Sequence, residues 1–191
     1  MKRSVWMFAT ALLWLVSVSQ VQAFEKGAEL PDVTINKKGE LRIDNDRISY
    51  APWGISEAKA GIPKIVFHIP ARMSSQSIID PMTDRLEAED FAEDRFQAIT
   101  VVNLDDALWG TAGIVASELE KNKRKHPEAT IVADDGSRAL KAWGLQRKAT
   151  YFILLDAEDR VIHSHEGQME QADIEQFIKL IKEQLDQADA A

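Results

Sequence analysis

Cysteine is absent from all 191 residues of this sequence. The chain therefore contains no disulfide, thiol nucleophile, iron–sulfur cluster or cysteine-ligated zinc. Basic residues are also few: 23 Lys and Arg stand against 31 Asp and Glu, which gives a net charge of −8 and a pI near 5.1. This acidic balance argues against nucleic-acid binding, which needs a basic face toward phosphate.

Long apolar runs are limited to a single one near the N-terminus, from Val5 to Val18. Met1-Lys2-Arg3 precedes it, and a segment ending in Val21-Gln22-Ala23 follows it. A basic start, an apolar run and a small residue at the end are typical of a secretory signal peptide, so we expect residues 1–23 to be one, cleaved after Ala23. A retained membrane anchor is the weaker interpretation, since a span needs about 20 apolar residues.

Cleavage would leave residues 24–191, which are 168 residues with a net charge of −10. The full chain is 45% hydrophobic, too apolar for a disordered chain, and the mature length suits one domain. We therefore expect a single secreted domain that no longer contacts the membrane after cleavage. Its oligomeric state stays open.

The apolar pattern beyond residue 60 alternates between two types. Short, nearly continuous apolar runs predict buried strands, and apolar residues three and four apart predict helices. The predicted strands are 65–69, 99–102 and 130–133, followed by a hairpin of 151–155 and 160–163. The predicted helices are 78–86, with Pro81 near its first turn, 114–125, a short turn at 138–143, and 174–185.

This order predicts an α/β fold with a central mixed β-sheet flanked by helices. Helices between buried strands imply parallel pairing, and a closing hairpin adds antiparallel strands. Ahead of the sheet, the extended segment 27–35 and a turn at Lys37-Lys38-Gly39 predict an extra N-terminal β-hairpin.

This element order, with its Gly27-x-x-x-Pro31-Asp32-Val33-Thr34 lead-in, resembles the thioredoxin-like fold in its peroxiredoxin and TlpA-type versions. Those families carry redox cysteines in the loop after the first buried strand, and a cis-proline before the hairpin. Here the loop 70–75 holds Arg, Met and Ser, and the segment 148–151 has no proline. The resemblance therefore implies the fold without the redox chemistry.

The resemblance is closer to the YtfJ family, small periplasmic proteins of Gram-negative bacteria that look like cysteine-free thioredoxin-fold proteins without an established activity. It implies a location and a fold, and no reaction or cofactor. The segments that carry it, spread over nearly the whole mature chain, are His68-Ile69-Pro70-Ala71-Arg72, Val102 to Ala107, Gly110-Thr111, Ser117 to Glu120 with Asn122-Lys123, Ala142 to Leu145, and Leu155-Asp156.

The loop 70–75 lies where a thioredoxin fold does its chemistry, at a strand end and a helix start. Arg72, Ser74 and Ser75 there predict an anion or peptide-carboxylate site. The alternative is that a serine caps the helix and Arg72 pairs with a nearby acid. His68, on the same strand face as Val66, is either a general base or ligand, or a neutral core histidine with a hydrogen bond.

Polar side chains also follow the next strand, at Asn103, Asp105 and Asp106. In the predicted sheet they lie beside the loop 70–75, where an aspartate can pair with Arg72 or help hold a cation. The alternative is an Asx-turn and helix cap ahead of Thr111.

Two further pairs of residues are weaker candidates. His163 and His165 share one strand face, but a metal site needs more ligands, and we expect the strand at Tyr151 to separate them from His68. Trp143 and Trp109 form either an aromatic wall near the loop or part of the core.

Three functions follow from these residues. We favour a redox-inactive binding module for a protein or peptide partner or a small anion, with its site at the sheet edge. The alternatives are a hydrolase or isomerase that uses His68 with Asp105 or Asp106 and perhaps Ser74, and a metal-binding module. The favoured site comprises His68, Arg72, Ser74, Asn103, Asp105, Asp106 and Trp143, with no metal or cofactor.

Overall fold

The computed structural model describes residues 24–189, so the expected signal peptide lies outside the described residues. Within that range the chain forms one seven-stranded sheet, four α-helices and two short 3-10 turns, Ile55–Glu57 and Leu104–Asp106. The strands are β1 (Ile35–Asp44), β2 (Arg47–Trp53), β3 (Lys64–Pro70), β4 (Gln97–Asn103), β5 (Thr130–Asp134), β6 (Tyr151–Leu155) and β7 (Val161–Glu166). The helices are α1 (Met73–Glu89), α2 (Ala112–Lys125), α3 (Arg138–Ala142) and α4 (Gln171–Asp189).

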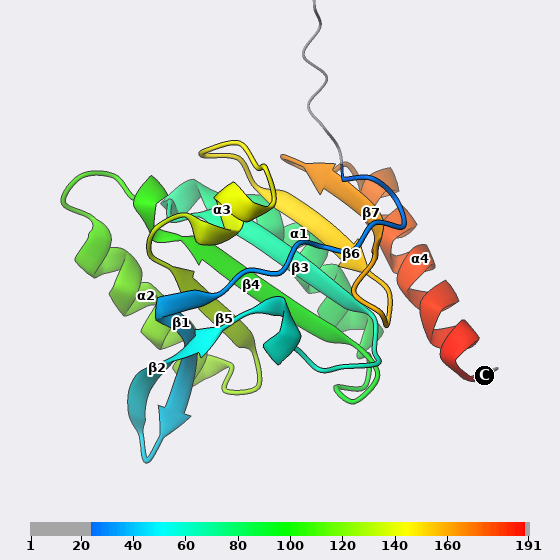
Figure 1. Cartoon of the computed structure of the whole chain (residues 1–191), viewed down its shortest axis with the longest axis horizontal. Coiled ribbons are helices and arrows are strands. Elements are labelled where there is room, and N and C mark those ends of the chain that lie inside the picture. Colours follow the sequence, from blue (N-terminus) through cyan, green and yellow to red (C-terminus); the bar gives the residue numbers. More distant parts are fainter. Residues whose placement is uncertain (1–23, 190–191) are drawn as a thin grey trace, which may run out of the picture.

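The sheet is mixed, as the sequence predicts. Its strand order is β2-β1-β5-β4-β3-β6-β7, with β3, β4 and β5 parallel and every other neighbouring pair antiparallel. Figure 1 shows β3 and β4 in the middle of this twisted sheet. Both faces of these central strands are covered by other parts of the chain, which explains why the strands read as continuous apolar runs.

The two faces of the sheet are covered differently. Alternate strand residues such as Phe67, Val102 and Phe152 pack with side chains of α1, α2 and α4 on what we call the helical face. The residues between them, such as Val66 and Ile153, face the opposite side. There the cover consists of the N-terminal segment 24–33, the 3-10 turn Ile55–Glu57 and α3, and we call this the N-terminal face.

The N-terminal hairpin exists, but its turn was predicted in the wrong place. The turn that joins β1 to β2 is Asn45-Asp46, where both residues have positive φ, as a two-residue type I′ turn requires. Gly39 instead lies inside β1, where the register of pairing with β2 shifts. Lys37-Lys38-Gly39 therefore marks a β-bulge rather than a chain reversal.

Helix α1 also begins earlier than predicted. It starts at Met73, directly after the end of β3, so Pro81 lies in the helix interior and not near the first turn. The first five helical residues, Met73 to Ser77, show no apolar periodicity, so the pattern becomes visible only from Ile78 onward. The exposed ring of Pro81 faces solvent, where water can satisfy the carbonyl that loses its helical partner.

Candidate functional site

The ends of the three parallel strands meet at one side of the sheet, which we call the carboxyl edge. Pro70 of β3 pairs with Asn103 of β4, and Asn103 pairs with Asp134 of β5. The backbone N–H of Ala71 also donates to the Asn103 carbonyl at 3.1 Å. The predicted proximity of the loop 70–75 to Asn103 is therefore confirmed.

A buried hydrogen-bond network occupies this edge on the N-terminal face. Asn103 Nδ2 donates to Asp106 Oδ2 at 2.9 Å, and both side chains are almost completely buried. Ser137 Oγ lies 3.0 Å from both Asn103 Oδ1 and Asp105 Oδ2. Asn103 Oδ1 also accepts from the backbone N–H of Asp105, so this side chain caps the 3-10 turn Leu104–Asp106. The predicted Asx-turn is therefore confirmed at Asn103, whereas no side chain caps the helix that follows Thr111.

Asp106 is held by a residue that the sequence analysis missed. The Arg147 guanidinium donates to Asp106 Oδ1 through Nε at 3.1 Å and through Nη2 at 2.9 Å, and Nη2 also reaches the Asp105 carbonyl. The backbone N–H of Lys148 donates to Asp106 Oδ2 at 3.0 Å. Asp106 thus fastens the loop before β6, the segment where thioredoxin-like families carry their proline, and it does not pair with Arg72.

His68 is neutral and buried, but it has no hydrogen bond. Its side chain is fully inaccessible, on the same face as Val66 as predicted, with its ring centroid 6.2 Å from that of Trp143 and 6.4 Å from that of Tyr151. Burial lowers the pKa of His68 to about 4, although the nearby Asp106 carboxylate acts in the opposite direction. Neither ring nitrogen has a partner among the described residues, which corrects the expectation of a hydrogen-bonded imidazole.

The start of α1 differs from the interpretation in which a serine caps the helix and Arg72 pairs with an acid. The N-cap residue is Arg72, and no side chain caps the helix. Ser75 Oγ donates back to the Pro70 carbonyl at 2.7 Å, and Ser74 is exposed. Arg72 is half-buried and forms no ion pair with any described residue, so the expected pairing with an acid is wrong. Its guanidinium remains available at the edge.

The two tryptophans do not form a wall. Trp143 is buried on the N-terminal face, and its Nε1 donates to the Pro31 carbonyl at 2.8 Å, which ties the N-terminal segment to the fold. Trp109, in the loop between β4 and α2, is 101% exposed. One is a core residue and the other lies entirely in solvent.

Trp109 belongs to a set of exposed apolar residues that the sequence analysis did not identify. The exposed fractions are 79% for Met73, 58% for Leu108 and 58% for Ile114. These four are the large hydrophobic side chains that are exposed within residues 24–189, and all lie in the segments directly after β3 or β4. We call them the apolar patch. The signal in the sequence was Leu108 and Trp109, two large apolar residues in a segment that fits neither a predicted strand nor a predicted helix.

The structure does not bring His163 and His165 together with further metal ligands among the described residues. His163 and His165 lie on β7, and β6 separates that strand from β3 and His68, as predicted. Within residues 24–189 no three His, Asp or Glu side chains gather as a metal would require. The same residues include no helix long and apolar enough to cross a membrane.

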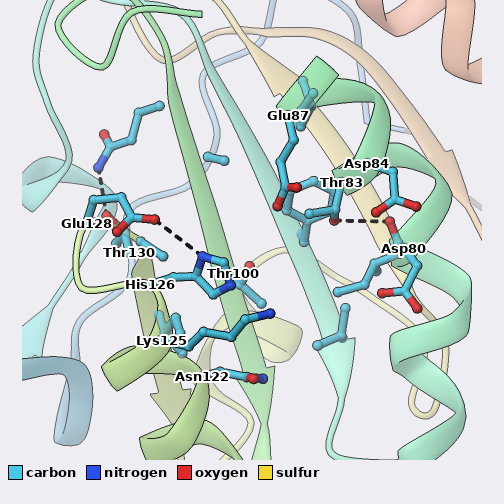
Figure 2. A pocket seen from close by; sticks show the side chains of 18 of the residues that line it. Asp80, Thr83, Asp84, Glu87, Thr100, Asn122, Lys125, His126, Glu128 and Thr130 are labelled. Atoms are coloured by element: carbon cyan, nitrogen blue, oxygen red, sulfur yellow. Dashed lines mark hydrogen bonds and ion pairs between the residues drawn. The ribbon is translucent and has the colours of Figure 1, made fainter. Parts of the chain in front are cut away.

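A cavity in the described part of the chain lies on the helical face and includes Ile69 and Gln76, which flank the loop 70–75. It is an open groove of about 710 Å³ between α1 and α2. Figure 2 shows side chains from both helices turned toward it. The polar network around Asn103 faces the opposite side of the sheet.

Comparisons with known proteins agree with this description. The chain is 29% identical to the uncharacterized protein YtfJ of Escherichia coli over 177 residues, 93% of this chain and 96% of that one. It is 32% identical to an uncharacterized protein of Haemophilus influenzae over 152 residues, 80% of this chain and 82% of the other.

Solved structures show the fold. A Chlorobium tepidum protein, provisionally assigned as the thiol:disulfide interchange protein DsbE, superposes with a TM-score of 0.57 at 20% identity, over 85% of this chain and 99% of that one. The fold is therefore thioredoxin-like, and without cysteine the chain is not a thiol-disulfide oxidoreductase. A family model described as a bacterial protein of unknown function, YtfJ_HI0045, matches residues 24–184. The expected family is confirmed: the chain belongs to the YtfJ_HI0045 family.

Proposed function

We propose that this protein is a periplasmic binding module that docks a partner protein at the carboxyl edge of its sheet. The observation that carries the proposal is the apolar patch: Met73, Leu108, Trp109 and Ile114 are exposed and come from the segments that follow β3 and β4, whose ends are paired at the carboxyl edge. Exposed large apolar side chains gathered in one region mark interaction surfaces. Tryptophan in particular is enriched among the residues that dominate binding energy.

The polar residues around the patch support a protein partner more than a small anion. Asn103, Asp106 and Arg147 are already bonded to one another, so they provide a rigid base rather than free ligand-binding groups. Arg72 and the exposed Asp105 remain at the rim, where polar groups of an interface usually lie. An anion would use Arg72 but would leave the apolar patch in water.

The enzymatic alternative gains no support from the geometry. His68 makes no hydrogen bond to Asp105 or Asp106, and the Asp106 oxygens are occupied by Asn103, Arg147 and the backbone of Lys148. A general base needs a partner and a substrate within hydrogen-bond reach. A binding role is therefore the better proposal.

The periplasmic location rests on the sequence. Residues 1–23 have the basic start, the apolar run and the Val21-x-Ala23 ending of a cleaved secretory leader. The absence of cysteine is compatible with that oxidising compartment, where an unpaired thiol would be at risk.

Photo-crosslinking in intact Gram-negative cells tests the proposal. A photoreactive amino acid replaces Leu108 or Ile114 in the full chain, and Gln187, exposed on α4, is the control position. We expect both patch positions to crosslink to the same periplasmic protein, and the purified pair to bind at least tenfold more weakly after Trp109→Ser, since a central tryptophan often contributes about 2 kcal/mol.

Trp109→Ser should leave the stability of the domain unchanged because the ring is exposed. The proposal fails if neither patch position crosslinks to a periplasmic protein, if Gln187 captures the same protein, or if the variant binds as tightly as the original chain.

A further inference from the structure

The groove between α1 and α2 has an apolar floor and two polar walls. Side chains of the central strands, among them Phe67, Thr100 and Val102, form the floor. In Figure 2, Asp80, Asp84 and Glu87 project from α1 on one side, and Asn122, Lys125 and His126 project from the end of α2 on the other. A volume of about 710 Å³ is that of a binding groove rather than a packing defect.

The α1 wall carries a row of unneutralised acids. Asp80, Asp84 and Glu87 follow one another at i, i+4 and i+7, so they lie along one face of the helix, about 5 to 6 Å apart. No lysine or arginine of the described residues forms an ion pair with them. The carboxylates therefore face the groove with their negative charge uncompensated.

On the side of α1 that faces α4, the charged side chains form ion pairs, in contrast to the acids on the groove side. Arg85 pairs there with Glu89 and with Glu175 of α4, and Lys182 of α4 pairs with Glu89 at 2.7 Å. Arg85 and Lys182 thus take part in the contact between α1 and α4. Lys179 pairs with Glu183 within α4. On the α2 wall, His126 faces Glu128 at 3.5 Å, and Glu128 adds another acid to the groove.

We propose that this groove docks a basic segment of a partner protein, with apolar side chains over Thr100 and Val102 and lysine or arginine side chains against the acidic row of α1. Charge complementarity selects this occupant, because six acidic side chains line the groove against two lysines, Lys59 and Lys125. Both helices start at the carboxyl edge, where Met73 precedes the wall residue Gln76 by one turn. The inference rests on the proposed function in that the groove extends the surface that begins at the apolar patch.

A fluorescent amphipathic peptide of lysine and leucine is the probe, and a peptide with glutamate in place of lysine is its control. Binding to the purified protein is followed by anisotropy at 0.15 M salt, where exposed charges are screened beyond about 8 Å. We expect the lysine peptide to bind and the glutamate peptide to bind at least tenfold more weakly.

A charge-matched pair of variants locates the site. The triple substitution Asp80→Asn, Asp84→Asn and Glu87→Gln should weaken binding of the lysine peptide at least tenfold. Removal of the same number of charges by Glu57→Gln, Glu183→Gln and Asp186→Asn, all exposed outside this groove, should change it less than twofold. Equal losses in the two triple variants would mean attraction to net charge alone and would overturn the inference.

A steric block tests the groove without changing its charge. Because the chain has no cysteine, Asn122→Cys carries the only thiol and takes a bulky neutral maleimide at the α2 wall. The adduct should abolish peptide binding, whereas the same adduct on Gln187→Cys should not. Binding that survives the Asn122 adduct contradicts the inference. If the groove variants still bind the crosslinked partner normally while Trp109→Ser does not, the inference fails and the proposed function stands.

Discussion

Among individual side chains, His68 stands out because it is completely buried and neither of its ring nitrogens has a hydrogen-bond partner among the described residues. A fully buried imidazole with two unpartnered nitrogens forgoes hydrogen bonds that it would make in water, at a cost of about 1–3 kcal/mol. Aromatic neighbours, Trp143 and Tyr151, surround the ring, and the nearby carboxylate of Asp106 is already saturated by other donors. The site therefore tolerates only the uncharged form at neutral pH.

This burial predicts a loss of stability in acid. The native pKa of His68, about 4, is below the value near 6.5 expected in the unfolded chain, so the unfolded state binds the proton first as the pH falls. The stability is unaffected above pH 6.5, and the loss grows as the pH falls until it reaches about 3 kcal/mol at pH 4. Urea unfolding of the protein and of His68→Leu between pH 7.5 and pH 4.5 measures it.

The variant should lose less stability than the original chain over this range. Parallel curves for the two proteins would show that His68 does not titrate between native and unfolded states and would contradict the prediction.

Part of this environment was predictable from the sequence. Strand alternation placed His68 on the face of Val66, and the strand order placed Asn103 beside Pro70. The choice of partner for Asp106 was not predictable, because Arg147 comes 41 residues later in an irregular loop whose path depends on the tertiary fold.

Among the strands, β1 can pair closely with β2 only because Gly39 has no side chain. Gly39 has φ of +85°, and a Cβ at this position would lie 2.1 Å from the Ala51 carbonyl oxygen of β2. The bulge therefore allows the two strands to approach more closely than any side chain permits. The sequence indicated a turn here because Lys-Lys-Gly has turn composition, whereas Asn45-Asp46, the real turn, lacks the glycine that usually marks it.

Gly39→Ala should therefore destabilise the protein by about 3 kcal/mol, the sum of a left-handed backbone conformation and overpacking against β2. Gly61→Ala is the matched control: its φ is +74°, but a Cβ there meets nothing within 4 Å. We expect the control to cost only about 1 kcal/mol. Denaturant midpoints of the two variants compare the effects, and equal losses would refute a steric role for Gly39.

For the molecule as a whole, the two faces of the sheet differ in how firmly they are covered. Three helices of 14 to 19 residues cover the helical face, whereas the N-terminal face depends on a mostly irregular segment. Its tethers include the bond from Trp143 to the Pro31 carbonyl and backbone bonds of Gly27 and Leu30 to the β6–β7 hairpin. Such a segment opens at a lower free energy than the core.

Trp143→Phe removes the indole donor and keeps an aromatic ring. Loss of one hydrogen bond of about 1 kcal/mol should speed amide exchange of Gly27 and Leu30 about fivefold. Hydrogen exchange followed by NMR measures these amides beside those of α1 and α2. If the variant speeds exchange only on the helical face, or leaves the exchange rates of Gly27 and Leu30 unchanged, then the Trp143 bond does not hold the N-terminal segment in place.

The pairing of β1 with β5 has a consequence for the order of assembly. Gly39 lies beside Ala133, so this contact joins positions 94 residues apart and closes most of the domain into one loop. The hairpin of β1 and β2 is local and can form on its own, whereas its docking needs β5 in place. We therefore expect the pairing of β1 with β5 to be a slow step in completing the sheet, because it has to close a long loop of chain.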